Sequence, residues 1–228
     1  MNTEHLFFDL DHTLWDFERN SKICLEAIMD REKQMLPSNF EIGLFLQHFS
    51  VINAGLWREL DENKINHDYL RQVRFQRVLA AMSIDISDQF SLQLNQHFLD
   101  TLPHQHHLMD DAFEVLEYLQ PKYQLHILSN GYLEIQRKKM HSAGILHFFE
   151  NIFTIDNAGY KKPEKAFFEY ALKSICTSPE NCVMIGDNLL TDIEGAQNAG
   201  IKAIYFNPEI QETNGNNINQ LLLLKDLF

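Results

Sequence analysis

The sequence predicts an α/β protein in which a parallel sheet is covered by helices on both faces and interrupted by an all-helical insertion. Two patterns support this prediction. Beyond residue 110, apolar runs of strand length alternate with helical stretches, as is typical of a parallel sheet with right-handed crossovers. From residue 16 to about residue 102, apolar residues recur at helical spacing instead. We therefore expect a core made of residues 1–15 and 108–228 and a helical cap made of residues 16–107.

The first predicted strand, over residues 6–8, runs into the segment Asp9-Leu10-Asp11-His12-Thr13. Side chains two positions apart on a strand point the same way, so Asp9 and Asp11 should project together from its carboxyl end. Paired carboxylates there need a cation, a shared proton or a basic partner, because unpaired buried charge is costly. We interpret them as a nucleophile and an acid/base beside a divalent metal. Taken alone, the segment also fits a polar strand exit that faces water.

The insertion is expected to form four or five helices, with apolar residues at helical spacing around residues 23–28, 42–49, 70–78 and 90–98. Turn or capping residues separate these stretches at 37–39 and 85–88. The polar segment Pro103-His104-Gln105-His106-His107 marks the return to the core. Its histidines lack carboxylate or thiolate company, so we assign them no metal role.

The rest of the core should alternate in a regular way. We expect strands at residues 123–128, 152–155, 182–185 and 203–206, and helices at 112–119, 133–143, about 164–172, 193–199 and the C-terminus. Ligands of parallel sheets lie outside the carboxyl ends of the strands. The residues that follow each strand are therefore the candidates for a site.

Three later strand ends carry polar residues. Ser129-Asn130-Gly131 offers a hydroxyl and backbone N–H groups ahead of a helix, which suits an anion, although a helix cap with a glycine turn fits equally. Lys162-Pro163 places a cation at a helix start, where the dipole disfavours it unless it serves an anion; a solvated lysine is the alternative. Gly186-Asp187 adds an acid at the same edge, and Asp192 follows in the next helical turn, where it could also be a simple cap.

Composition limits the partners. The 228 residues carry a net charge of −13, which argues against a nucleic acid polymer. Cys24, Cys176 and Cys182 show no close metal-binding spacing and favour a reducing compartment. No basic leader or membrane-length apolar run is evident, so we expect a cytoplasmic protein that does not enter a membrane. The sequence does not indicate an oligomeric state.

In their order along the chain, Asp9-x-Asp11-x-Thr13, Ser129-Asn130-Gly131, Lys162-Pro163 and Gly186-Asp187-x-x-x-x-Asp192 resemble the four motifs of the haloacid dehalogenase-like hydrolase superfamily. The resemblance covers the whole chain and implies a Rossmann-like core with an inserted cap. Within the superfamily, Trp15-Asp16-Phe17, Leu56-Trp57 and residues 162–172 are similar to bacterial pyrimidine 5′-nucleotidases. Met109-Asp110 departs from the Pro-Gly of many relatives, at the hinge rather than in the chemistry.

The resemblance implies roles for the acids. Asp9 would be the nucleophile that forms an aspartyl phosphate. Asp11 would protonate the leaving oxygen and then activate water, for which we expect a raised pKa beside other carboxylates. Asp9, the backbone carbonyl of Asp11 and Asp187 would hold Mg²⁺. Asp192 would orient Lys162 or a water on the metal.

It also implies roles for the groups that meet the substrate. Lys162 would act in catalysis by stabilising the phosphoryl oxygens. The substrate-binding residues would be Thr13, Ser129, Asn130 and Gly131. We therefore expect a Mg²⁺-dependent phosphatase for a small phosphorylated metabolite, with a cap that closes over the site and selects the leaving group.

For the substrate we expect a nucleoside 5′-monophosphate, with Trp15 and Trp57 as stacking candidates and Arg74 and Arg77 as hydrogen-bond donors. Core packing explains the tryptophans, and a solvated helix face explains the arginines, as easily. A phosphosugar phosphatase, a phosphonate hydrolase and a mutase stay open as alternatives. A dehalogenase needs no acid at Asp11, and a catalytically silent metabolite-binding member would tolerate the loss of motif residues, all of which are present.

Overall fold

The computed structural model describes residues 3–228 and divides into two compact units. The core comprises the residues up to Phe17 together with Gln105–Phe228, and the cap comprises Glu18–His104. Residues 16–17 and 105–107, expected in the cap, thus group with the core. None of the helices in the described residues has the length and apolar character needed to cross a membrane.

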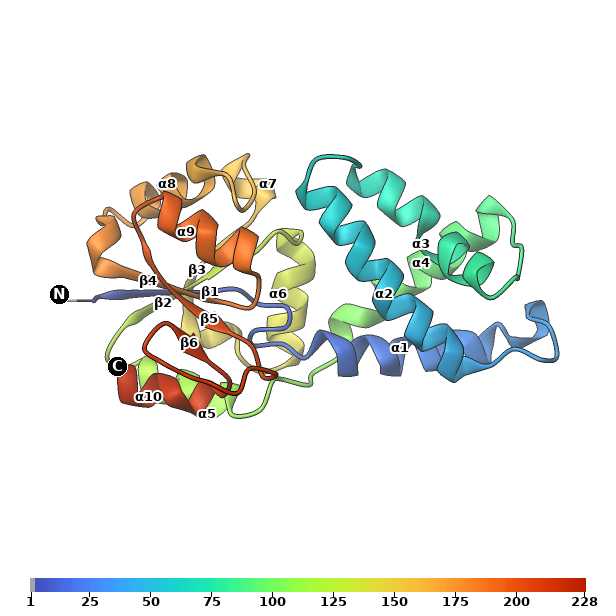
Figure 1. Cartoon of the computed structure of the whole chain (residues 1–228), viewed down its shortest axis with the longest axis horizontal. Coiled ribbons are helices and arrows are strands. Elements are labelled where there is room, and N and C mark those ends of the chain that lie inside the picture. The colour runs from blue at the N-terminus through green and yellow to red at the C-terminus, as the bar shows by residue number, and fades with distance from the viewer. Residues whose placement is uncertain (1–2) are drawn as a thin grey trace. The chain divides into compact units, whose positions relative to one another are not determined.

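The core is built on a six-stranded parallel sheet with the order β3-β2-β1-β4-β5-β6 within the described residues, which confirms the predicted fold class (Figure 1). Its strands are β1 (His5–Phe8), β2 (Gln124–Leu128), β3 (Phe149–Phe153), β4 (Cys182–Gly186), β5 (Lys202–Phe206) and β6 (Asn217–Ile218). Phe8 of β1 pairs with Ile127 of β2 and Ile185 of β4. The residues that follow these three strands therefore reach the same edge of the sheet.

Helices cover both faces of this sheet. They are α5 (Ala112–Leu119), α6 (Leu133–Ser142), α7 (Ile155–Ala158), α8 (Lys165–Ser174), α9 (Gly195–Asn198) and α10 (Leu224–Leu227). Figure 1 shows α8 and α9 on one face and α5 and α10 on the other. Phe7 and Met184 pack against Phe167 and Phe168 of α8 in an apolar cluster that anchors this helix.

Two predicted boundaries are wrong. The strand expected at 152–155 ends at Phe153, because α7 starts at Ile155, where Asn157 Oδ1 accepts the backbone N–H of Thr154 at 2.8 Å. Exposed Glu150 and Asn151 left no alternating pattern by which to find the start of this edge strand. The helix expected at 193–199 begins earlier, with a π-helical turn, Leu189–Glu194, ahead of α9.

The cap is built from α-helices and two short 3₁₀ helices, Lys33–Met35 and Leu102–His104, and α1 starts at the last core residue before it. The α-helices are α1 (Phe17–Arg31), α2 (Ile42–Asp61), α3 (His67–Ala81) and α4 (Asp88–Thr101). The side chains of Asn66 and Ser87 cap α3 and α4 by accepting backbone N–H groups. The cap core is aromatic, with ring centroids 5.3 to 6.3 Å apart among Phe45, Phe49, Phe75 and Phe98.

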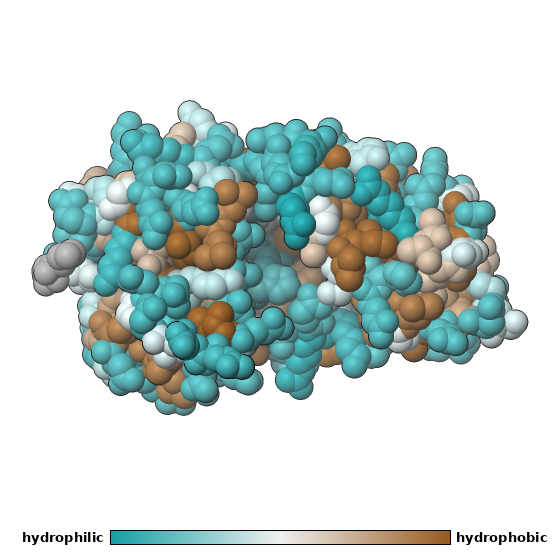
Figure 2. Space-filling model, viewed as in Figure 1, coloured by the Kyte–Doolittle hydropathy of each residue, from teal (hydrophilic) through white to brown (hydrophobic). Residues whose placement is uncertain are grey.

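The face of the molecule shown in Figure 2 is mostly hydrophilic. On this face, hydrophilic residues surround separate apolar patches (Figure 2). The net charge of −13 makes association with a polyanion unfavourable.

Two histidines form a buried polar chain within the sheet. His5 Nδ1 lies 3.2 Å from His126 Nε2, and His126 Nδ1 lies 3.2 Å from the side-chain amide of Asn151. If Asn151 donates to Nδ1, the His126 proton is on Nε2 and is donated to His5. Burial lowers the pKa of His126 to about 4 and also lowers the pKa of His5. Both rings are thus neutral near pH 7.

Protonation of His126 should therefore oppose folding in acid. The unfolded chain takes up this proton near pH 6.5, whereas the folded chain does so only near pH 4. The free energy of unfolding is unaffected by this group above about pH 6.5, and it falls by up to about 3 kcal/mol as the pH drops to about 4. In urea unfolding at about pH 7.5 and about pH 5, His126→Phe should reduce this loss, and the exposed-site control His147→Gln should retain it. An unchanged loss in His126→Phe contradicts the assignment.

Candidate active site

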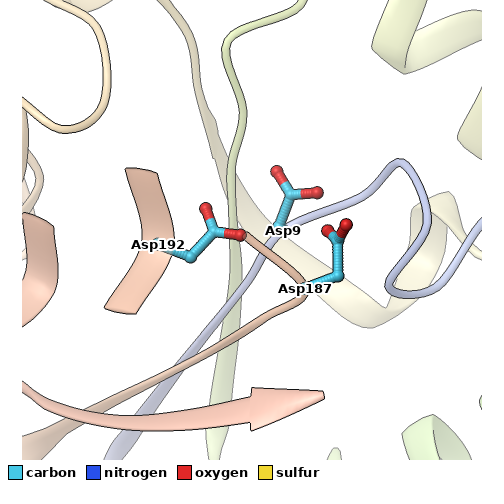
Figure 3. A group of neighbouring side chains, drawn as sticks. All are labelled: Asp9, Asp187 and Asp192. Carbon is cyan, nitrogen blue, oxygen red and sulfur yellow. The ribbon is translucent and has the colours of Figure 1, made fainter. Parts of the chain in front are cut away.

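Three carboxylates meet at the carboxyl edge of the sheet. Asp9 follows β1, Asp187 follows β4 and Asp192 lies in the π-helical turn; an oxygen from each lies within 4.8 Å of the others. Figure 3 shows Asp187 and Asp192 on either side of Asp9. A Cβ on Gly186 would lie 2.3 Å from Asp192 Oδ2, so glycine is required for this approach.

Lys162 supplies the positive charge of this cluster. Its Nζ lies 2.5 Å from Asp9 Oδ1 and 2.6 Å from Asp192 Oδ1, and the side chain is buried. The side chain of Asn130 holds the main chain of Lys162, since Oδ1 accepts from its N–H at 2.8 Å and Nδ2 donates to its carbonyl at 3.0 Å. The Lys162–Pro163 peptide bond is cis. Asn130 thus positions the lysine through its backbone.

The cluster carries more negative than positive charge. Burial raises the pKa of Asp9 well above its ordinary value, with Lys162 opposing the rise and Asp192 and Asp187 adding to it. Burial, followed by the charge of Asp192, raises the pKa of Asp187 to about 6. Burial acts to lower the pKa of Lys162, but Asp192 and Asp9 raise it overall. The carboxylate oxygens of the three acids form a hard-oxygen donor set that fits a divalent cation such as Mg²⁺.

Asp187 and Asp192 are themselves held by the protein. Thr13 Oγ1 donates to Asp187 Oδ1 at 3.1 Å, and Thr13 is fully buried. Asp192 Oδ2 accepts the backbone N–H of Asn188 at 3.0 Å, while its other oxygen binds Lys162. Thr13, expected to bind substrate, thus supports an acid of the cluster in this structure.

Asp11 has a different environment from the one expected. Lys139 Nζ lies 2.6 and 2.9 Å from its two carboxylate oxygens, and Gln136 Nε2 donates to Oδ2 at 2.9 Å. Burial acts to raise the pKa of Asp11, but Lys139 and Gln136 outweigh it and lower this pKa overall. The expected raised pKa is thus wrong for this structure, because a lysine and an amide face Asp11 where other carboxylates were expected.

The Ser129 hydroxyl stands between two donors. Ser129 Oγ accepts the backbone N–H of Gly131 at 3.1 Å and Gln136 Nε2 at 2.6 Å. The Gly131 amide, expected to bind a phosphoryl oxygen, is therefore engaged with Ser129 here. Ser129 itself is buried at the end of β2, on the same edge as Asp9.

Gln136 and Lys139 on α6 were missed by sequence reasoning. They lie one turn apart, and both are buried. The sequence offered little indication of their role, because glutamine and lysine in a helix are usually exposed to solvent. The available clue was that Gln136, Lys139 and the apolar Met140 share one face of a helix that starts directly after a strand-end motif.

The aromatic and basic residues considered for a base are engaged elsewhere. Trp15 is fully buried, donates to the Gln105 carbonyl at 3.4 Å and packs against Lys139, so its stacking role is contradicted. In the cap, Trp57 packs against the cluster of Leu56, Leu60 and Leu70. Arg77 binds Glu59 at 3.3 Å and Tyr69 at 3.4 Å, and Arg74 lies buried with its guanidinium carbon 5.4 Å from the Phe98 ring centroid.

The sequence and the fold are similar to those of known proteins. The model of the haloacid dehalogenase-like hydrolase family matches residues 3–200, and the chain belongs to that family. The glyceraldehyde 3-phosphate phosphatase of Methanothermobacter thermautotrophicus is 39% identical over 216 residues, which cover 94% of this chain and 90% of that protein. The pyrimidine 5′-nucleotidase PynA of Streptococcus pneumoniae is 31% identical over 208 residues, covering 89% and 83%.

A solved structure matches the whole chain. The crystal structure of the HAD-hydrolase YfnB of Bacillus subtilis, bound to magnesium, has a TM-score of 0.87 and 30% identity, covering 100% of this chain and 99% of that one. The chain is therefore a haloacid dehalogenase-like hydrolase in sequence and in fold.

The excess negative charge predicts that the metal-free protein gains stability when one carboxylate is removed. The pKa of Asp187, raised to about 6, means that its ionisation opposes folding near pH 7.5. Asp187→Asn keeps an oxygen for Thr13 and should raise the melting temperature in EDTA by roughly 2–8 °C. The surface control Glu180→Gln removes the same charge and should change it by less than about 1 °C. Equal shifts in both variants would count against repulsion at the site.

Proposed function

We propose that this hydrolase is a Mg²⁺-dependent phosphatase that cleaves small phosphomonoesters through an aspartyl phosphate on Asp9. The observation that carries the proposal is the position of the Asp9 carboxylate, at the sheet edge between Lys162 and Asp187. A carboxylate so placed can attack an electrophile whose negative oxygens are bound by the lysine. Membership of the family supports this reading.

In the first step, an Asp9 oxygen attacks phosphorus, the bond to the leaving oxygen breaks, and that oxygen takes a proton. In the second step, water attacks phosphorus, gives up a proton, and the acyl phosphate bond breaks to restore Asp9. Asp11 would give the first proton and take the second. The ionised form, which Lys139 favours in this structure, is the form that the second step requires.

The remaining groups would serve the phosphoryl oxygens and the cation. Ser129, the backbone of Asn130 and Lys162 would donate to the phosphoryl oxygens. Asp9, Asp187 and the backbone carbonyl of Asp11 would hold Mg²⁺, in agreement with the hard-oxygen chemistry of the site. When bound, the metal would neutralise charge on the phosphoryl group and fix its orientation. Asp192 would keep Lys162 in place, as its 2.6 Å contact indicates.

For the leaving group we favour a nucleoside 5′-monophosphate, on the support of the PynA relative. A small sugar phosphate is the second candidate. It is favoured by the 39% identity to a glyceraldehyde 3-phosphate phosphatase and by the burial of Trp15, which removes one stacking surface.

The chemistry is tested with p-nitrophenyl phosphate. We expect hydrolysis with Mg²⁺ and loss of activity in excess EDTA. Asp9→Asn should lower kcat by at least about 10³-fold, because an amide cannot attack phosphorus. The surface variant Asp226→Asn makes the same acid-to-amide change and should keep the wild-type rate. Full activity in EDTA, or in Asp9→Asn, would refute the mechanism.

The leaving group is tested separately, by kcat/KM for UMP, dUMP and dTMP against glyceraldehyde 3-phosphate and hexose phosphates. We expect the best nucleotide to exceed the best sugar phosphate by about tenfold, or about 1.4 kcal/mol of transition-state preference. A tenfold preference for a sugar phosphate would reject the nucleotide and leave the phosphatase chemistry intact.

A further inference from the structure

Gln136 of α6 touches both Ser129 and Asp11 and has no role in the mechanism above, and Lys139 enters it only by favouring the ionised form of Asp11. We propose that Gln136, together with Lys139, is a positioning residue that fixes the Ser129 hydroxyl and the Asp11 carboxylate in one arrangement. The inference rests on the proposed phosphatase function and extends it to residues outside the four motifs.

Gln136 determines where the Ser129 hydroxyl points. A serine oxygen has two acceptor positions and one proton. Both acceptor positions are filled, by the Gly131 N–H at 3.1 Å and by Gln136 Nε2 at 2.6 Å. The hydroxyl proton must therefore be donated away from these groups, which makes Ser129 a fixed donor for an anionic oxygen.

The same amide also holds Asp11. Gln136 Nε2 donates to Asp11 Oδ2 at 2.9 Å, so its two N–H groups serve Asp11 and Ser129 together. Lys139 Nζ lies 2.6 and 2.9 Å from the two oxygens of Asp11. The carboxylate is thus held by two side chains from one helix face.

The orientation of the buried Gln136 amide leaves its oxygen without a hydrogen bond from the part of the chain that the structure describes. Gln136 is fully buried, and its Oε1 finds no hydrogen-bond partner among the described residues. A flipped amide would turn this oxygen towards the Asp11 carboxylate, which is repulsive. The protein thus leaves a buried acceptor unpaired, which is unfavourable for stability, while both donors serve the site.

Two neighbours make room for the arrangement and support it. A Cβ on Gly131 would lie 2.6 Å from Gln136 Nε2 and 2.7 Å from its Cδ, so residue 131 must be glycine for Gln136 to reach Ser129. The Lys139 ammonium lies 4.7 Å from the ring centroid of the buried Trp15. Trp15 thus acts on the site through Lys139.

The two contacts of Gln136 predict different kinetic effects. The hydrogen bond from Gln136 to Ser129 acts on the phosphoryl group, which all substrates share. The contacts that hold Asp11 matter most when the leaving oxygen needs a proton, as in β-glycerol phosphate. They matter least for p-nitrophenyl phosphate, whose leaving group is an acidic phenol. The kcat/KM values of these two substrates report the first chemical step. They therefore distinguish an effect through Ser129 from an effect through Asp11.

The test measures kcat/KM with Mg²⁺ for both substrates. Removing Lys139 also removes a charge that favours the ionised form of Asp11, but the carboxyl group is then no longer held towards the leaving oxygen. We expect this loss of position to dominate, so that Lys139→Met loses at least about tenfold more activity on β-glycerol phosphate than on p-nitrophenyl phosphate, and Lys139→Arg restores most of that difference. Gln136→Met should lower both values by at least about tenfold. The matched control is Lys138→Met, because Lys138 is the exposed neighbour on α6, and it should resemble the wild type.

Gly131→Ala supplies a second route to the Gln136 defect, should Gln136→Met fail to fold, because the added methyl displaces the amide. Equal loss on both substrates in Lys139→Met, without rescue by arginine, would show a merely structural lysine and overturn its role. Gln136→Met or Gly131→Ala within twofold of the control would overturn the role of Gln136. A wild-type chain without phosphatase activity would instead reject the proposed function.

Discussion

The buried ammonium of Lys162, held between Asp9 and Asp192, is the interaction on which the rest of the site depends. Without it, Asp9 and Asp192 would lose the cation that contacts both of them. The contacts around it serve this placement. Asn130 fixes the lysine backbone, and Gly186 lets Asp192 approach. The parallel register of β1, β2 and β4 brings these segments to one edge, although they are far apart in sequence.

Much of this arrangement can be predicted from the sequence, because parallel strands end at one edge of the sheet and the residues that follow each predicted strand can be identified. That logic correctly placed Asp9, Asp187 and Lys162 together. It could not identify the side chains that helices of the core direct into the site. The partner of Asp11 is Lys139, 128 positions away, and only the packing of α6 decides which of its polar residues turn inward. The expected pKa of Asp11 had the wrong direction for this reason.

The site also shows how function competes with stability. The acids of the cluster are buried and repel one another, so that the pKa values of Asp9 and Asp187 rise. Gln136 leaves an oxygen unpaired in the interior. Each feature is unfavourable for the folded chain alone, and in the proposed mechanism each would serve the binding of a cation and a phosphoryl group. The histidine pair of the sheet, in contrast, satisfies its own hydrogen bonds away from this edge.

The central claim is that Asp9 carries the phosphoryl group during turnover. The most direct measurement is rapid acid quenching of the protein during hydrolysis of a ³²P-labelled phosphomonoester with Mg²⁺, followed by peptide mapping. The account predicts label on the peptide that contains Asp9, and no label in Asp9→Asn. Label on a different residue, or steady turnover with no labelled protein at any quench time while Asp9→Asn remains active, would contradict it.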